Sequence, residues 1–470
     1  MAKKERYRPW QINDFTAGKI DKSVDSKIPD NAARDCQNFI SVRVGSMEKR
    51  GGQKYLNGTE LEGPIRGLYA YYFNGTRRLI AVSYGKAYYW NGSAFVKFND
   101  SLSQSADMLF ETCVNYMVAF NGVDAPWKWD GTTVSALANA PAKGRYPALH
   151  KEKLFCVDAD EPSTLKWSNS FEPEEWPEVN YWDIRKGDGD EITCLMPEFA
   201  GELIIFKERS IHTLKGTSLD DFALVELESS IGCVGPRAAA RHGLQIYFVG
   251  NDGLYMTNGM STVNLSEARI PDTWETINKQ YLNKAVVGVW NGLIRFDLPE
   301  EDSTYNNFTL FYNPVTQAFW PMRGLNVSCY QTYNNGSRII FYSGSSSNGY
   351  VIEQDTGTED FGSPIEAYWK GRYYDMGVPE LQKKSRKAYI QDSPQTSRRA
   401  ILSVSLDYGE YNNLDYNRTE KYTREYLFSP GANRWNHISP MVYHNSSGNC
   451  EVRGILIPYK PKPTMGVRET

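Results

Sequence analysis

Three acidic side chains stand close together in the loop Gly187-Asp188-Gly189-Asp190-Glu191. Carboxylate oxygens are ligands that calcium prefers, so Asp188, Asp190 and Glu191 are the first candidates for a metal site. An EF-hand loop, however, spreads its ligands over about a dozen residues. The compact run therefore favours a solvated turn between strands, and we predict no metal site and no cofactor.

A second candidate is the stretch Ser405-Leu406-Asp407-Tyr408-Gly409, whose residue order is similar to the Asp-box of sialidase-type propellers. The similarity ends at Asn412, where the Asp-box has Thr or Trp, and the pattern occurs once. The chain also has no GxSxG, no P-loop and no GxGxxG that opens a helix. We therefore predict no catalytic residues and a chain that is not an enzyme.

The densest basic run contains Lys383, Lys384, Arg386 and Lys387. Such a cluster could contact the phosphates of DNA in a channel or acidic residues of a neighbouring subunit. A solvated loop is the alternative, because one short charged run usually faces water. The net charge of the whole chain is −4, which excludes a basic nucleic-acid coat.

Cysteine and histidine do not form a ligand pattern. The 7 cysteines include no CxxC pair, and the 5 histidines are scattered. Clustered spacing would be expected for a zinc site or a disulfide framework. We therefore expect the cysteines to be small apolar core residues. They are Cys36, Cys113, Cys156, Cys194, Cys233, Cys329 and Cys450.

Turn residues are the strongest signal for the elements that position these groups. Asn-Gly and Asp-Gly supply the positive φ angles of tight hairpins, and most of them stand between strand-like runs. Between Ile65 and Phe98, such turns separate four predicted strands of one up-and-down sheet. Asn-Gly begins at residues 57, 74, 91, 121, 258, 291, 335 and 348, and Asp-Gly at 130, 188 and 252.

This four-stranded unit recurs along the chain. The step Trp90-Asn91-Gly92 returns as Trp129-Asp130-Gly131, each time between a third and a fourth strand. Similar units follow up to Glu353, the last one with only three visible strands. A period of about 40 residues is typical of propeller blades. The sequence predicts an all-β fold with a propeller of six or seven blades over residues 61–357.

Two flanks lie outside the repeat. Residues 1–60 are polar and include a weakly helical stretch at 30–38, so we expect an N-terminal arm for assembly. The arm's apolar residues are too irregularly spaced for one amphipathic helix and could lie on a neighbouring surface; they include Trp10, Phe15, Ile28 and Phe39. Residues 358–470 contain strand-like runs joined by long polar loops, which predicts a separate C-terminal β-rich domain.

Several stretches resemble the tail hub or nozzle proteins of short-tailed bacteriophages, which are propeller-bearing tail tubular proteins of the DNA-stabilisation type. The N-terminal stretches are Asp14-Phe15-Thr16-Ala17-Gly18, Ile28-Pro29-Asp30-Asn31, Cys36-Gln37-Asn38-Phe39 and Met47-Glu48-Lys49-Arg50-Gly51-Gly52. Further similar stretches include Arg145-Tyr146-Pro147, Gly187–Ile192, Ile231–Val234 and Ile365–Gly377. The nozzle forms of the shortest-tailed phages are usually longer than this chain.

The resemblance implies a structural virion protein that forms a homo-oligomeric ring, most simply a hexamer. Such a ring would continue the DNA channel, retain packaged DNA and allow its ejection. The implied partners are head-to-tail adaptor or portal-side tail proteins, tail fibre or spike proteins, and double-stranded DNA in transient contact. The implied location is the virion tail, after synthesis in the host cytoplasm, with no membrane segment. The alternatives are a carbohydrate-binding or carbohydrate-cleaving propeller at the tail tip and an adaptor-like propeller of a cell.

Overall fold

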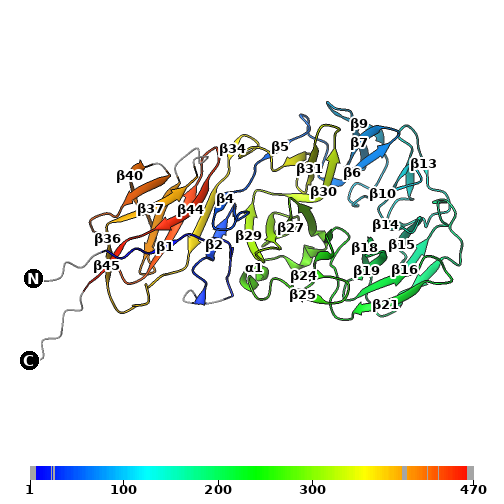
Figure 1. Cartoon of the computed structure of the whole chain (residues 1–470). Coiled ribbons are helices and arrows are strands. Elements are labelled where there is room, and N and C mark those ends of the chain that lie inside the picture. Colours follow the sequence, from blue (N-terminus) through cyan, green and yellow to red (C-terminus); the bar gives the residue numbers. More distant parts are fainter. Residues whose placement is uncertain are drawn as a thin grey trace, which may run out of the picture.

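The computed structural model describes residues 7–22, 24, 27–393, 400–420, 422–431 and 433–462. Strands dominate this part of the chain, as predicted. Two short helical segments, α1 (Pro271–Glu275) and the 3₁₀ helix η2 (Lys279–Lys284), lie between two of the sheets (Figure 1). Within the described residues, no helix is long and apolar enough to cross a membrane.

Six four-stranded antiparallel sheets follow one another in the described chain, each made of consecutive strands. The first two contain β6 (Ile65–Phe73), β7 (Thr76–Ser83), β8 (Lys86–Trp90) and β9 (Phe95–Asn99), then β10 (Leu109–Cys113), β11 (Tyr116–Phe120), β12 (Trp127–Trp129) and β13 (Val134–Ala136). The next two contain β14 (Gly144–His150), β15 (Lys153–Asp158), β16 (Glu161–Trp167) and β17 (Tyr181–Asp183), then β18 (Ile192–Phe199), β19 (Glu202–Lys207), β20 (Ile211–Lys215) and β21 (Ala223–Glu228). The last two contain β22 (Ala239–His242), β23 (Gln245–Val249), β24 (Leu254–Thr257) and β25 (Thr262–Asn264), then β26 (Val286–Trp290), β27 (Leu293–Leu298), β28 (Phe308–Asn313) and β29 (Ala318–Arg323).

A seventh sheet joins the two ends of this series. Its strands β30 (Val327–Asn334), β31 (Ile339–Ser345) and β32 (Val351–Gln354) are consecutive, but the next strand is β5 (Gln53–Tyr55) from the N-terminal segment. In this pairing Ile352 lies opposite Tyr55 and Gln354 opposite Gln53. The pair β33 (Glu359–Asp360) and β34 (Ser363–Pro364) extends the sheet beyond β5. The fourth strand of the last unit thus precedes the expected boundary at residue 61.

The predicted Asn-Gly turns form two-residue hairpins where both residues have positive φ. Asn74 and Gly75 have φ of 47° and 73° and connect β6 to β7, with Phe73 paired to Thr76. Asn291 and Gly292 do the same between β26 and β27. Asn and Gly tolerate this region, and the resulting turn twists with the strands.

The sheets surround a common axis, which is the arrangement of a β-propeller (Figure 1). The first strands of neighbouring sheets contact one another, including β6 with β10, β14 with β18 and β30 with β6. Apolar side chains are buried between sheets; for example, Ile65 and Leu79 of the first sheet pack with Val351 of the seventh. All 7 cysteines are buried and unpaired, so the expectation of small core residues is confirmed.

The remaining strands form a second β-rich unit beside the propeller (Figure 1). One sheet has the order β3 (Phe39–Ile40), β4 (Met47–Lys49), β44 (Glu451–Leu456), β37 (Lys387–Asp392), β41 (Thr423–Leu427), β40 (Asp415–Glu420), and β1 (Gln11–Ile12) also pairs with β44. The other has the order β2 (Ala33–Gln37), β35 (Ala367–Gly371), β43 (Ile438–His444), β38 (Ile401–Leu406), β39 (Tyr411–Asn413). A small third sheet contains β42 (Arg434–Trp435), β36 (Lys383–Ser385) and β45 (Tyr459–Pro461).

The N-terminal segment is therefore not a separate arm. Its strands β1, β2 and β4 pair with strands of the C-terminal part, β3 pairs with β4, and β5 pairs with the propeller. The weakly helical stretch expected at 30–38 contains strand β2, which pairs with β35 along Cys36 and Trp369. The sequence could not reveal these pairings, because each strand is short and its partner lies hundreds of residues away.

The N-terminal segment also fastens the two units to each other. Lys19 forms β-bridges to Phe319 of β29 and to Ala33 of β2, so the sixth propeller sheet continues into the second unit. The Asp21 carboxylate accepts hydrogen bonds from the backbone N–H groups of Asp272 and Thr273. The core of the second unit includes Trp320 and Met322 from β29. One hydrophobic cluster thus contains residues of both units.

Candidate functional site

The basic run does not form one exposed patch. Strand β36 turns Lys383 into the interior, where its Nζ donates to the carbonyl oxygens of Val378 and Asn436 at 2.6 and 2.9 Å. Burial lowers the pKa of the Lys383 ammonium, although nearby carboxylates oppose this shift. Lys387 pairs with Glu425 at 3.1 Å, Lys384 is half-buried and Arg386 is exposed. The run alternates because a strand directs successive side chains to opposite faces.

The four apolar residues expected to contact another surface lie in the chain's own core. Phe15, Ile28 and Phe39 are buried, and Trp10 packs partly buried against Tyr374 at a ring distance of 4.5 Å. Phe15 contacts Trp369 edge-on at 5.2 Å. Phe15 and Phe39 belong to the core of the second β unit, Trp10 packs against that core, and Ile28 packs in a small cluster with other residues of the N-terminal segment, so these side chains are not a surface for a neighbouring subunit. Their irregular spacing reflects several short strands and turns.

The acidic loop is neutralised by a buried lysine. The Nζ of Lys207, which is 0% exposed, donates to both Asp188 oxygens at 3.1 Å and to the Ile184 carbonyl at 2.9 Å. Asp190 is also buried and accepts from the Arg209 N–H and the Ser210 hydroxyl. Glu191 is exposed. The loop is thus a hydrogen-bonded link between the third and fourth sheets, more buried than the expected solvated turn.

No group of three or more His, Cys, Asp or Glu side chains in the described ranges is arranged to hold a metal ion. The Ser405–Gly409 stretch forms the hairpin turn between β38 and β39. Its Asp407 accepts from the backbone N–H groups of Asn436 and His437 at 2.7 Å, and the Ser405 hydroxyl donates to the Gly409 carbonyl. These contacts assign Asp407 a role in holding two loops together.

A single arginine crosses the centre of the propeller. Arg237 precedes the fifth sheet, yet its guanidinium donates to carbonyl oxygens on the first, second and seventh sheets. The acceptors are Arg66 at 2.6 Å, Met108 at 2.9 Å and Ser328 at 3.1 Å, and Asp107 lies 3.5 Å from the same guanidinium. Because these acceptors lie on or next to the innermost strands, Arg237 links the fifth sheet to the first, second and seventh sheets across the centre of the propeller.

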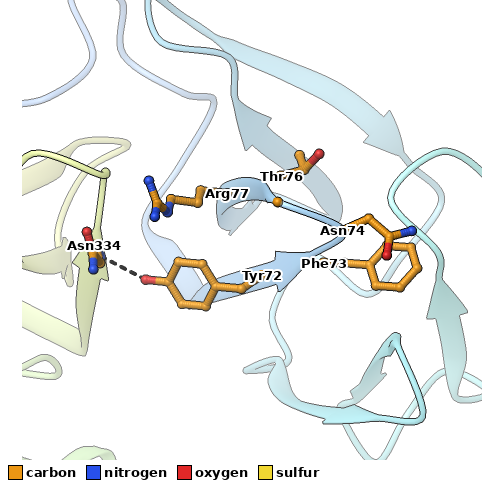
Figure 2. A pocket seen from close by; sticks show the side chains of 7 residues that line it. Tyr72, Phe73, Asn74, Thr76, Arg77 and Asn334 are labelled. Carbon is orange, nitrogen blue, oxygen red and sulfur yellow. Dashed lines mark hydrogen bonds between the residues drawn. The ribbon is translucent and has the colours of Figure 1, made fainter.

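A pocket of about 450 Å³ lies where the β6–β7 hairpin meets the tip of β30 (Figure 2). The two-residue turn at Asn74-Gly75 places Tyr72 directly opposite Arg77 on the same face of the hairpin. Figure 2 shows both side chains projecting toward Asn334, away from Phe73 and Asn74. The lining residues are Tyr72, Phe73, Asn74, Gly75, Thr76, Arg77 and Asn334.

The pocket is held by contacts between the two hairpins. The Tyr72 hydroxyl accepts a hydrogen bond from the Asn334 N–H at 2.8 Å, and the Tyr72 ring stacks on Tyr333 with centroids 6.1 Å apart. The Arg77 guanidinium lies against the backbone of Gly336, where an added Cβ would come within 2.2 Å of Nη1. Gly336 has a φ of 97° and so keeps this position open for Arg77.

The charges around this pocket are positive. Its lining contains one guanidinium and no carboxylate. Burial and the neighbouring Tyr72 phenol raise the pKa of the Tyr333 phenol, whereas Arg78 and Arg77 lower it. Arg78 lies over the Tyr89 ring at 4.7 Å. The arrangement can therefore accept an anion, for which it offers guanidinium, hydroxyl and amide donors.

Sequence reasoning located the turn of this pocket but not the pocket itself. The Asn74-Gly75 hairpin already implied that Tyr72 and Arg77 are cross-strand neighbours, which was the available signal. Nothing in the spacing indicated that Asn334 and Gly336, from the last sheet, would complete the pocket. Arg237 had no local signal, because its partners lie 91 to 171 residues away.

No protein-family model and no curated protein matches the chain. Solved structures align with about two thirds of the chain at low similarity. The extracellular domain of a one component system from B. thetaiotaomicron aligns with a TM-score of 0.46 and 8% identity, over 64% of this chain and 39% of that chain. YCF48 bound to D1 peptide aligns with a TM-score of 0.41 and 9% identity, over 65% and 95%. BBS1N in complex with ARL6DN aligns with a TM-score of 0.41 and 10% identity, over 65% and 96%.

Proposed function

We propose that this chain is a structural virion protein of a tailed bacteriophage, which forms a tail hub or nozzle ring that continues the DNA channel. The observation on which the proposal depends is that three of the four N-terminal stretches resembling that family, those containing Gly18, Asn38 and Arg50, contact the propeller at the seam between the two β units. Arg50 donates to both Asp360 oxygens, to Asn38 Oδ1 and to the Arg323 carbonyl. Gly18 lies against the Phe319 carbonyl, where a Cβ would be 2.5 Å away.

In this proposal the propeller has seven blades, the last closed by β5. The pairing of β5 with β32 supports this count, because it supplies the fourth strand that the last unit lacks. A strand from one end of the chain that completes the sheet at the other end closes the ring and hides an edge. The second β unit then combines the N-terminal segment with residues from about 365 onward.

The DNA channel in the proposed assembly runs between subunits and not through a propeller. Arg237 and its carbonyl partners occupy the axis of the propeller, which supports this route. A cyclic ring, most simply a hexamer, repeats one heterologous contact and leaves an opening on its symmetry axis. The surfaces for this contact are then exposed ones, because Phe15, Ile28 and Phe39 are buried within the chain.

The proposed partners are adaptor or portal-side tail proteins on one side of the ring and fibre or spike proteins on the other. Packaged double-stranded DNA is the transient ligand, and the virion tail is the location after synthesis in the host cytoplasm. A chain with this role has no hydrolase activity. Turnover of host lipopolysaccharide or capsule by the purified chain, lost in Asp407→Ala, would contradict that assignment.

Electron microscopy of the purified chain, together with native mass spectrometry, tests the proposal. We expect rings with a central opening and a mass of six subunits, and labelled antibody bound on the tail axis of intact particles. A chain that stays monomeric at all concentrations, and is absent from particles, contradicts the proposed role.

A carbohydrate-binding propeller at the tail tip is the second candidate. A pocket of about 430 Å³ between the second and third sheets favours it, because Trp176 and the half-exposed Tyr181 line it together with Glu161 and Asp183. Aromatic faces and fixed polar groups are suited to ligands that are apolar on one face and polar at the edges. Binding of host glycans by the purified chain, abolished in Tyr181→Ala, would favour this candidate over the first.

A further inference from the structure

We infer that the pocket between the β6–β7 and β30–β31 hairpins, here called the hairpin pocket, binds a backbone phosphate of double-stranded DNA. The pocket is defined by Tyr72, Thr76, Arg77 and Asn334. The inference rests on the proposed function, since it identifies the surface of the ring that meets the DNA.

The first argument for a phosphate ligand is the set of hydrogen-bond donors in the hairpin pocket. Arg77 is exposed. Among the described residues that line the pocket there is no carboxylate that could form an ion pair with it. The Tyr72 oxygen accepts from the Asn334 N–H, which leaves the phenol O–H as a donor for a ligand. The Arg77 guanidinium and the Tyr72 phenol lie on the same face of the hairpin and are the two side-chain donors of the site, whereas Thr76 lies with Phe73 on the other face. Charge-assisted hydrogen bonds from guanidinium to phosphate are among the strongest of such contacts.

The second argument is that the donor side chains of the hairpin pocket are already positioned before a ligand binds. The Arg77 guanidinium lies against the backbone of Gly336, and Tyr72 is held by its stacking on Tyr333 and by the Asn334 N–H. A guanidinium that is already positioned loses less side-chain entropy when it binds a ligand. A long flexible lysine on open surface would lack this advantage.

The third argument is the match between the charge of the hairpin pocket and the charge of a phosphodiester. One guanidinium in the lining matches the single charge of a phosphodiester, and Arg78 adds positive potential behind it. The two hairpin tips lie at the surface, with Tyr72 45% exposed, so the pocket is open to a ligand as large as a duplex. Contacts of this kind position DNA without reading its sequence, as a tail channel requires.

The test measures binding of a fluorescein-labelled duplex of about 30 random base pairs by anisotropy, over a range of sodium chloride concentrations. The full chain is compared with Arg77→Ala, Arg77→Lys and the control Arg43→Ala, which removes an exposed arginine from a loop of the other β unit. We expect Arg77→Ala to weaken binding several-fold at low salt. The slope of log K against log salt should fall by about 1 per site.

Arg77→Lys should retain most of the slope, and Arg43→Ala should behave as the wild type. Sodium phosphate at the same ionic strength as sodium chloride separates the two sources of the ligand. If phosphate displaces the duplex beyond the effect of ionic strength, and Arg77→Ala abolishes that excess, the pocket is a site for free phosphate and the inference is overturned. Equal affinity and slope for Arg77→Ala and wild type also overturn it, as does a wild type that binds no duplex at low salt.

Ring formation is measured separately for each variant by electron microscopy. Arg77→Ala is expected to form the same rings as the wild type, because the Arg77 guanidinium lies against the neighbouring hairpin of its own chain. Wild-type rings that do not bind the duplex would contradict the phosphate site in the hairpin pocket but would not contradict the proposed function. Absence of rings in every variant would count against the proposed function itself.

Discussion

At the scale of single residues, the interior contains ionisable groups whose charge is set by their surroundings. Asp297 is 0% exposed between the sixth and seventh sheets, and it accepts from the Thr309 hydroxyl at 2.6 Å. Burial raises the pKa of Asp297 to about 7, although Thr309 and the nearby Arg295 oppose the shift. Arg295 is itself buried between the Phe311 and Phe341 rings and pairs with Asp355.

The raised pKa predicts a pH dependence of stability. A folded-state pKa above the unfolded value of 3.8 means that the unfolded chain ionises first. Stability from this group is therefore present below about pH 4 and is lost as the pH rises to about 7, by on the order of 4 kcal/mol. We expect Asp297→Asn to remove this slope from the free energy of unfolding, measured in urea between pH 4 and 8. The exposed Asp302→Asn is the control, and an unchanged slope in Asp297→Asn would contradict the assignment.

At the scale of elements, hairpin turns determine the register of each sheet. Gly92 has a φ of 105° in the turn between β8 and β9, and open space surrounds its Cα. A side chain at position 92 would therefore destabilise the fold through backbone strain and not through a steric clash. Gly92→Val should lower the free energy of unfolding by about 1–3 kcal/mol. Gly58→Val is the matched control, since Gly58 is exposed, has open space and lies outside the left-handed region; equal melting temperatures for the two variants would argue against the turn.

Contacts between sheets at the propeller axis depend on Arg237. Removing its guanidinium takes a charged donor from the carbonyl groups of Arg66, Met108 and Ser328, although the Arg66 carbonyl keeps the Met108 N–H as a donor. We expect Arg237→Ala to cost about 2–4 kcal/mol, because hydrogen bonds from charged donors are worth about 1.5–3 kcal/mol each and water replaces part of the loss. Hydrogen exchange should accelerate first in β6, β10 and β30.

Arg241→Ala is the control for that variant, because the exposed Arg241 also donates to a carbonyl, that of Glu198 at 2.7 Å, but on the surface. We expect a change below about 1 kcal/mol there. If hydrogen exchange in the Arg237→Ala variant accelerates equally in all sheets, Arg237 does not specifically stabilise the contacts between the innermost strands.

At the scale of the whole molecule, the propeller and the second β unit behave as one body. They share a core through Trp320 and Met322, and Arg50 lies at the seam with its side chain 2% exposed. We expect the wild type to unfold in one calorimetric transition. Arg50→Ala should lower stability by about 3 kcal/mol, since it leaves the Asp360 carboxylate without its ion-pair partner, while Asn38 keeps the Arg323 N–H as a donor. The control Arg338→Ala breaks an exposed pair with Glu353 and should cost less than about 1 kcal/mol. Two separate transitions in the wild type would contradict a shared core.

The sequence by itself determined the hairpins of the propeller and their repetition. The strands at Ile65–Phe73 and Lys86–Trp90 have the predicted bounds, because Asn-Gly turns and apolar alternation act within a few residues. It also determined that the cysteines are core residues, since no ligand spacing connects them. These properties depend on local backbone preferences, which a single stretch of sequence contains.

Only the tertiary structure decided which segments meet. β5 joins β32, β2 joins β35, and the pocket of Arg77 is completed by Gly336, all from distant parts of the chain. The sequence also could not predict that Lys383 and Lys207 are buried. A lysine is stable in the interior only where carbonyl or carboxylate oxygens converge on its ammonium group. Such convergence is a property of the packed sheets, and a short strand of two to five residues carries too little pattern to specify a partner hundreds of residues away.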